Sequence, residues 1–295
     1  MMNVSLKRKK LKKFTMFDIV ISTIMTILVI LIIIPFWNAI VISFSTNEFY
    51  IHNRFALWPG DFTLSNYAAL FSRGSGLITA YGNTIWVSII GTVAGMVVMT
   101  LAAYAFSRRF PGRRILFMIA IFSMYFGGGL VPTYLNLKNL HLLNTHTGVI
   151  MLTLVSVSHI IIIMKGFDAV PKDLEEAAII DGANDFTVFW KVMLPLNKPT
   201  LATYALFTFV DLWNGWYWPM LILTDSEKSL LQVYLRNIVN AASRIAGTAD
   251  SVSGSSISMG VQMACSLEVI LPVMLIYPYV QKYFVKGIYV GSVKM

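Results

Sequence analysis

Two acidic residues, Asp211 and Glu268, lie inside long apolar stretches of this 295-residue chain. Because a carboxylate is costly within a bilayer, such residues usually face a bundle interior or an aqueous cavity. An aromatic segment with an amide side chain follows the first of them and comprises Trp213, Asn214, Trp216 and Tyr217. Aromatic rings can cover the apolar faces of a sugar, while amide and carboxylate groups can bond its hydroxyls. We expect these six residues to line a polar pathway.

Two other interpretations of the same residues stay open. The tryptophans could form an aromatic belt at the membrane surface, and the acids could be protonated groups that hydrogen-bond between helices. Asp211 and Glu268 could also relay a proton or cation in an ion-coupled secondary transporter.

A polar segment, 175–183, separates two apolar stretches and predicts two short helices joined at a glycine. Asp173 and Glu176 have the spacing of a capping box at the start of the first helix. Gly182 can adopt the left-handed conformation that ends this helix. We expect a protruding loop over about residues 168–198.

The second helix of this loop also has boundary signals. Asn184 or Asp185 can cap its start, and Pro195 and Pro199 are expected to bound its end.

Nucleotide hydrolysis and metal chemistry have no matching motif. The sequence contains no Gly-x4-Gly-Lys-Ser/Thr phosphate loop, so we expect this chain not to hydrolyse nucleotide itself. The four histidines lack metal-ligand spacing and lie at His52, His141, His146 and His159. We therefore expect no enzymatic reaction on this chain and no cofactor or metal bound by it.

The elements that must carry these residues are membrane helices. Hydrophobic residues make up 57% of the chain and charged residues only 13%, against roughly 25% charged in soluble proteins. Apolar runs of the roughly 20 residues that cross a bilayer recur at 19–47, 74–107, 115–137, 139–164, 199–224 and 257–281. Three glycines and Pro132 within the third run predict a helix interruption. The sequence predicts an all-α polytopic membrane protein with six transmembrane helices.

Most of the 23 lysines and arginines fall on alternate connections between these runs. The positive-inside rule therefore places both termini and the 168–198 loop in the cytoplasm. The net charge of +9 then reflects topology and contact with membrane lipid, with no nucleic-acid partner. We divide the chain into a basic cytoplasmic N-terminus, 1–16, and a single transmembrane domain, 17–295.

The polar loop also resembles a known signature. Glu176-Ala177-Ala178, then Gly182 after three residues and Val192-Met193-Leu194-Pro195 after nine more, resemble the loop of permeases from binding-protein-dependent ABC importers. Further stretches are similar to the carbohydrate-uptake branch and its oligosaccharide-type subgroup, at 174–191, 213–219, 127–134 and 281–287. The resemblance assigns no role to Glu268.

This resemblance implies the type I ABC importer permease fold in a bacterial cytoplasmic membrane, with a sugar or oligosaccharide as cargo. It implies four partner subunits: a second homologous permease, two cytoplasmic ATPases that bind ATP and magnesium, and an extracytoplasmic solute-binding protein. The residues that it implies for coupling to the ATPase are Glu175, Glu176, Ala177, Ala178, Asp181, Gly182, Leu194 and Pro195.

Overall fold

The computed structural model describes residues 15–72, 76–246 and 258–292, and every regular element in these ranges is a helix. The predicted all-α fold is thereby confirmed. The predicted N-terminal segment, 1–16, lies almost entirely outside the described residues.

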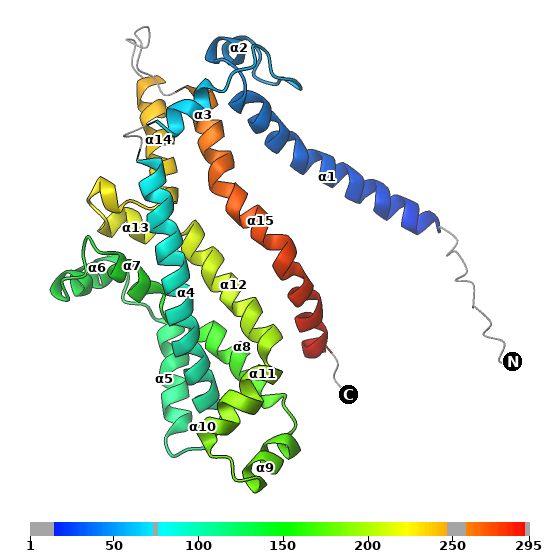
Figure 1. Cartoon of the computed structure of the whole chain (residues 1–295), viewed down its shortest axis with the longest axis vertical. Helices are drawn as coiled ribbons and strands as arrows, with labels where there is room; N and C mark the ends of the chain where they lie inside the picture. The colour runs from blue at the N-terminus through cyan, green and yellow to red at the C-terminus, as the bar shows by residue number, and fades with distance from the viewer. Residues whose placement is uncertain (1–14, 73–75, 247–257, 293–295) are drawn as a thin grey trace, which may run out of the picture.

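Three helices run alongside one another down the long axis of the molecule (Figure 1): α4 (Leu77–Ser107), α12 (Lys198–Asn214) and α15 (Met259–Ser292). A fourth, α8 (Val157–Asp168), packs on α4 toward the lower end in this view. Close packing at the centre depends on glycine, because a Cβ at Gly91 of α4 would meet the side chain of Leu212 at 2.7 Å.

Helix α1 (Met16–Ser43) diverges from this group and contacts α15 (Figure 1). Its 28 residues span roughly 42 Å. Only its C-terminal end is buried, at Val41, Ile42 and Ser43, and its other large apolar side chains are exposed. In a membrane protein such a surface faces lipid or another chain.

Two pairs of helices are sharply bent. α5 (Arg113–Tyr125) and α6 (Leu130–Asn139) meet at 113°, and α7 (His146–Thr153) and α8 meet at 53°. Between α5 and α6 lie the three glycines, and Gly129 has a φ of 82°. The predicted interruption of the third apolar run is confirmed.

The fifth apolar run forms two helices rather than one. α12 ends at Asn214, and α13 (Tyr217–Ile222) begins after Gly215. Asp211 therefore lies in the last turn of α12 and not within one continuous helix. The physical reason is the break at Gly215, whose extended backbone ends the helix (φ −65°, ψ 119°).

Within the described residues, three helices are long and apolar enough to cross a membrane: α1, α4 and the Met259–Pro278 part of α15. Counting each bent pair as one span gives up to five. This arrangement is that of a multi-pass membrane protein.

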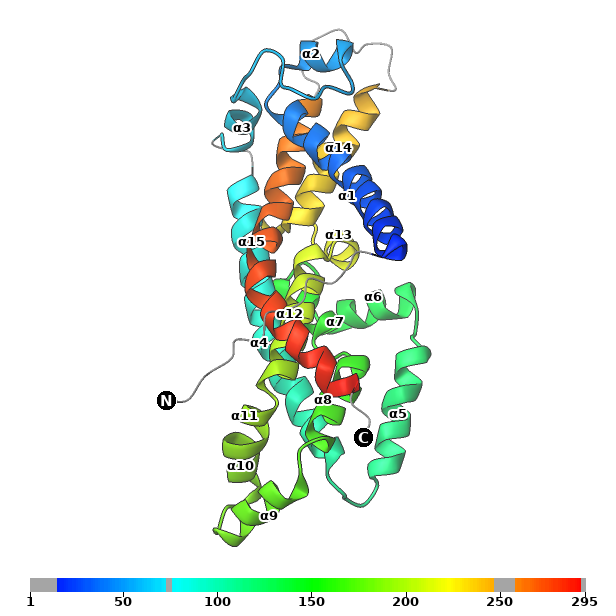
Figure 2. The same ribbon diagram turned by 90° about the vertical axis from the view of Figure 1, so that its right-hand side faces the viewer.

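Short elements cover the end of the molecule where α4 begins (Figures 1 and 2). They are α2 (Asn47–His52), α3 (Ser65–Leu70) and α14 (Leu231–Ala246), with a 3-10 turn at Ser226–Lys228. Apolar side chains of α3, α12, α14 and α15 form one core cluster there, around the buried Trp213.

Candidate functional site

Four helical segments form the 168–198 loop between α8 and α12: α9 (Lys172–Ile180), α10 (Asp185–Val188), a π-helix (Phe189–Met193) and α11 (Leu194–Leu196). They lie at the lower end of the molecule in both views, away from α2 and α3 (Figures 1 and 2). The predicted protruding loop of short helices is therefore present.

The predicted capping box of the first loop helix is wrong. α9 begins at Lys172 with Pro171 at its N-cap, so Asp173 lies within the first turn and no side chain caps the helix. Proline suits this position because its φ, here −57°, is already close to helical and it has no N–H to satisfy. The carboxylates of Asp173 and Glu175 still stabilise α9, because they lie near the positive end of the helix dipole.

Gly182 ends α9 as predicted. Its φ is +83°, its N–H donates to Ile179 at 2.9 Å, and the N–H of Ala183 donates to Ala178 at 2.9 Å. These two bonds form a Schellman motif. Apart from its chain neighbours, no atom of the described residues lies within 4 Å of a Cβ built on Gly182. The left-handed backbone, and not crowding within the chain, therefore accounts for glycine here.

The second loop helix starts as predicted but continues further. Asn184 caps α10 through a bond from the N–H of Thr187 at 2.8 Å. Pro195 does not end the helical path, because a π turn leads into α11 and α12 follows with Pro199 in its first turn. The wider π turn accommodates a proline that lacks an N–H and would otherwise break the helix.

The loop exposes large apolar side chains together with acids, and the rings of Phe186 and Trp190 lie 6.0 Å apart. Ile180, Phe186 and Trp190 are 84%, 68% and 54% exposed. Exposed polar and small residues beside them are Glu176, Ala177 and Asp181. Apolar patches rimmed by polar residues mark protein contacts. Of the other predicted coupling residues, Pro195 is exposed, whereas Ala178 and Leu194 pack inward against a core cluster.

Glu175 turns toward its own chain. Its carboxylate pairs with the guanidinium of Arg108, the residue that follows α4. The same guanidinium donates to the Tyr104 hydroxyl at 2.8 Å and lies 4.5 Å from the centre of that ring. The Tyr104 hydroxyl donates to the carbonyl of Asp185 at 3.4 Å. Arg108 thus ties the end of α4 to α9, and Tyr104 ties it to α10.

Aromatic packing supports this polar connection. Tyr104 contacts Phe167 of α8 and Phe189 of the π-helix, with ring centroids 5.7 and 4.7 Å apart. Both phenylalanines are buried in a cluster that also contains Met99 and Ala103 of α4. The loop is consequently fastened to the bundle mainly through α4 and α8.

Two cavities of about 540 and 270 Å³ adjoin α12, and both are lined by Asp211 and Thr153. The smaller cavity is also lined by Asn214, Trp216 and Tyr217. Four of the six predicted pathway residues therefore meet at one place.

The remaining two pathway residues lie elsewhere. Trp213 is 2% exposed and its indole N–H donates to the carbonyl of Val269 at 3.2 Å, so it packs α12 against α15. Glu268 is half-buried on α15 and lines neither cavity, although its carbonyl accepts the Tyr81 hydroxyl. The buried position of Trp213 against α15 contradicts its placement in the pathway. The placement of Glu268 in the pathway stays a prediction.

The larger cavity contains polar residues that sequence reasoning missed. They come mostly from the break between α7 and α8 and include Ser156, Ser158 and His159, with Thr208 of α12. The available signal was the run Ser156–His159, which interrupts the fourth apolar stretch with polar side chains. The imidazole packs against the Tyr204 ring at 4.9 Å.

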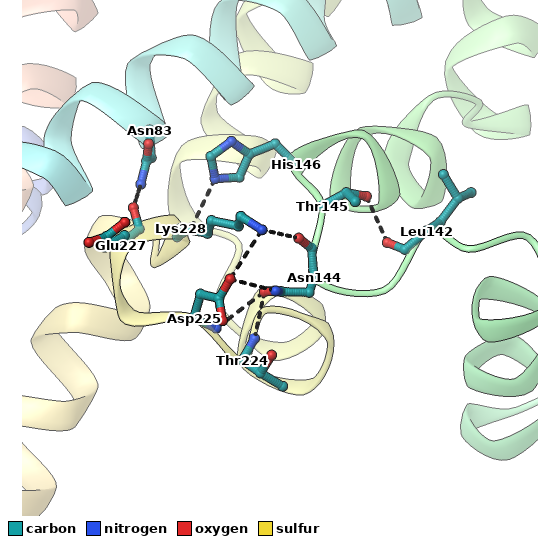
Figure 3. Close-up of polar contacts among 9 residues, drawn as sticks. All are labelled: Asn83, Leu142, Asn144, Thr145, His146, Thr224, Asp225, Glu227 and Lys228. Atoms are coloured by element: carbon teal, nitrogen blue, oxygen red, sulfur yellow. Dashed lines mark hydrogen bonds and ion pairs between the residues drawn. The ribbon is translucent and has the colours of Figure 1, made fainter.

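A polar network joins the connection between α6 and α7 to the connection between α13 and α14 (Figure 3). Asn144, in the left-handed conformation, accepts the N–H groups of Thr224 and Asp225 and donates to the Asp225 carboxylate at 2.6 Å. Lys228 donates to the Asn144 carbonyl at 3.1 Å, and His146 contacts the Lys228 carbonyl at 2.9 Å. The bonds from Asn144 and Lys228 hold the pKa of Asp225 below its ordinary value.

Partly open cavities that contain a carboxylate and hydroxyl groups between apolar membrane helices are characteristic of proteins that move solutes. They favour the class of multi-pass membrane transport proteins for this chain. Its family follows from sequence comparison. Residues 76–288 match the family described as "Binding-protein-dependent transport system inner membrane component", and the chain belongs to this family.

Individual relatives are similar to this chain over most of its length. Protein LplC of Bacillus subtilis is 36% identical over 89% of each chain. The polygalacturonan/rhamnogalacturonan transport system permease protein YtcP of the same organism is 37% identical over 89% of this chain and 92% of its own length. A solved relative is a chain in the crystal structure of a bacterial ABC transporter involved in the import of the acidic polysaccharide alginate. It is 34% identical in sequence and superposes with a TM-score of 0.82. The match covers 91% of the present chain and 96% of the relative.

The family assignment confirms the resemblance based on the Glu176–Pro195 signature. It also decides between two classes of transporter. Binding-protein-dependent transport is the importer class, so the ion-coupled secondary transporter loses its support.

Proposed function

We propose that this chain is a permease subunit of an ABC importer and supplies half of the translocation pathway for a sugar or oligosaccharide. Family membership over residues 76–288 carries the proposal. The relatives support the cargo class, because YtcP is named for polygalacturonan and rhamnogalacturonan transport and the structural relative for import of the acidic polysaccharide alginate.

In this proposal residues 17–295 form one transmembrane domain with six spans in a bacterial cytoplasmic membrane. The six are α1, α4, the two bent pairs, α12 with α13, and α15. Helix α12 has 17 residues and spans roughly 26 Å, close to the thickness of the hydrocarbon core. The distribution of lysine and arginine supports cytoplasmic termini and a cytoplasmic 168–198 loop.

The partners in the proposed complex are a second permease, two ATPase subunits that bind ATP and magnesium, and a solute-binding protein. The exposed apolar side chains of Ile180, Phe186 and Trp190 contribute to the surface on which an ATPase docks. Closure of the ATPase pair would move the 168–198 loop, and the contacts of Tyr104 and Arg108 would pass that motion to α4. This chain itself catalyses no reaction and binds no cofactor.

The cargo path passes the junction of the two cavities at Asp211. Serine and threonine hydroxyls, an imidazole and a carboxylate can all bond sugar hydroxyls. Trp216 and Tyr217, 38% and 43% exposed, offer aromatic faces beside them.

Substitution of Asp211 by Asn tests this path. Because a hydrogen bond to a charged group contributes about 1.5–3 kcal/mol, loss of the charge should reduce uptake of the preferred saccharide roughly tenfold or more. ATP-dependent uptake by the complete complex in proteoliposomes measures the effect. Asp61→Asn is the control, since Asp61 is exposed in a loop with a φ of 49° that asparagine adopts readily. Equal uptake by both variants would exclude Asp211 from the path.

A further inference from the structure

A surface cavity of about 970 Å³ lies between α5, α8 and the connection from α4 to α5. It shares no lining residue with the two cavities at Asp211. Four cationic side chains line it, from Arg109, Arg113, Arg114 and Lys165. The permease function described above makes no use of this site.

Positive charge in the cavity is only partly compensated. Lys165 lies 3.6 Å from the carboxylate of Asp168, and the Arg113 Nε–H donates to the carbonyl of Phe106 at 2.6 Å. Arg109 and Arg114 are exposed and form no ion pair within the described part of the chain. The cavity therefore favours an anion.

The rest of the lining is mostly apolar. Phe117 and Ile121 of α5 and Ile161 of α8 are half-buried, and Ile115 is 61% exposed. A free inorganic anion would gain nothing from this wall, whereas an acyl chain would bury apolar surface against it. Cations beside an apolar groove on a membrane protein match an anionic amphiphile.

We propose that this cavity binds one anionic phospholipid. Arg109 and Arg114 hold its phosphate, with Arg113 and Lys165 nearby, and an acyl chain lies along the apolar residues of α5 and α8. The bound lipid would fasten α5 to α8. Ser123 of α5 and Ser158 of α8 both line the larger cavity at Asp211, so the lipid would also stabilise the spacing across the proposed cargo path.

Lipid retention by the assembled complex is the direct test. The complex is placed in nanodiscs of phosphatidylcholine with a minor fraction of phosphatidylglycerol, and the lipids that stay bound are counted by native mass spectrometry. Each cation near an anionic surface changes binding by about fivefold, so Arg109→Gln/Arg114→Gln should weaken retention of phosphatidylglycerol on the order of 25-fold. This double variant keeps the bond between Arg113 and Phe106.

Two further variants make the test specific. Arg54→Gln/Lys138→Gln removes the same charge from two exposed residues outside the cavity and should keep the bound phosphatidylglycerol. Ile161→Trp keeps all four cations but fills the apolar wall, and should lose the lipid. An excess of inorganic phosphate should leave the lipid in place.

Three results would overturn the proposal. One is equal retention of phosphatidylglycerol by the wild type and Arg109→Gln/Arg114→Gln. Another is displacement by inorganic phosphate, which would indicate a simple anion site. The third is a wild-type complex without bound lipid, combined with an Ile161→Trp variant that no longer assembles with the second permease. That result would show that the second permease covers this cavity. A wild-type complex that retains the lipid but transports no sugar would contradict the proposed function alone.

Discussion

Gly182 has the most restrictive backbone requirement in the proposed docking surface. Its φ of +83° penalises any side chain, yet the space around it is open within the chain. Contacts within the chain therefore give no reason to exclude a small polar side chain that tolerates the left-handed conformation at position 182.

A comparison of Gly182→Asn with Gly182→Asp separates backbone strain from docking. Asparagine and aspartate both tolerate this conformation better than other side chains do, so the two variants should insert and fold alike. Only aspartate adds negative charge beside Glu176 and Asp181 at the proposed ATPase contact. We expect Gly182→Asp to abolish ATP-driven uptake and Gly182→Asn to keep a measurable part of it. Matching uptake by the two variants would argue against a docking role for this turn.

At the scale of elements, α4 connects the two parts of the site. Its C-terminal end holds the 168–198 loop through Tyr104 and Arg108. Further along, Met99 lines the larger cavity, and its sulfur accepts the N–H of Ser156 at 3.4 Å, at the break between α7 and α8. A shift of the loop would therefore reach the cavity wall through one continuous helix.

The pair Arg108–Glu175 tests this connection. Its side chains are 30% and 22% exposed, so we expect an interaction of about 1 kcal/mol, weakened by salt. Arg108→Gln and Glu175→Gln should each raise the number of ATP molecules hydrolysed per sugar imported, and the double variant should be no worse than either single one.

A different outcome would assign the Glu175 carboxylate to the ATPase contact. If Glu175→Gln impairs coupling and Arg108→Gln adds a second, independent loss, then Glu175 contacts the ATPase rather than α4. Thermal stability of the purified complex, measured in parallel, shows whether either change acts through unfolding.

Sequence patterns predicted local features well and side-chain directions poorly. The glycine at 182 and the glycine triplet before Leu130 are set by backbone preferences, which neighbouring residues alone determine. Asp211 and Trp213 are only two positions apart, yet one lines both cavities and the other is buried against α15. That difference depends on which helices pack around α12, and a single sequence does not specify it. The bond between Arg108 and Glu175, 67 positions apart, likewise had no sequence signal.

At the scale of the whole molecule, this chain has the shape of one part of an assembly. Helix α1 is buried only at its C-terminal end, and the 168–198 loop exposes Ile180, Phe186 and Trp190. This loop lies at the lower end of the molecule (Figures 1 and 2). Large exposed apolar surfaces outside the lipid require partners. In the proposed complex, other subunits supply the energy, and this chain supplies the pathway and the helix α4 that transmits the motion.

The most direct test is uptake of labelled oligosaccharides into proteoliposomes that contain this chain, its second permease and the ATPase subunits, with the solute-binding protein supplied outside. We predict uptake only when magnesium and ATP are present on the ATPase side, and none when the ATPase is left out. Uptake by the permeases without the ATPase, driven by a proton or sodium gradient, would contradict the account and restore the ion-coupled carrier.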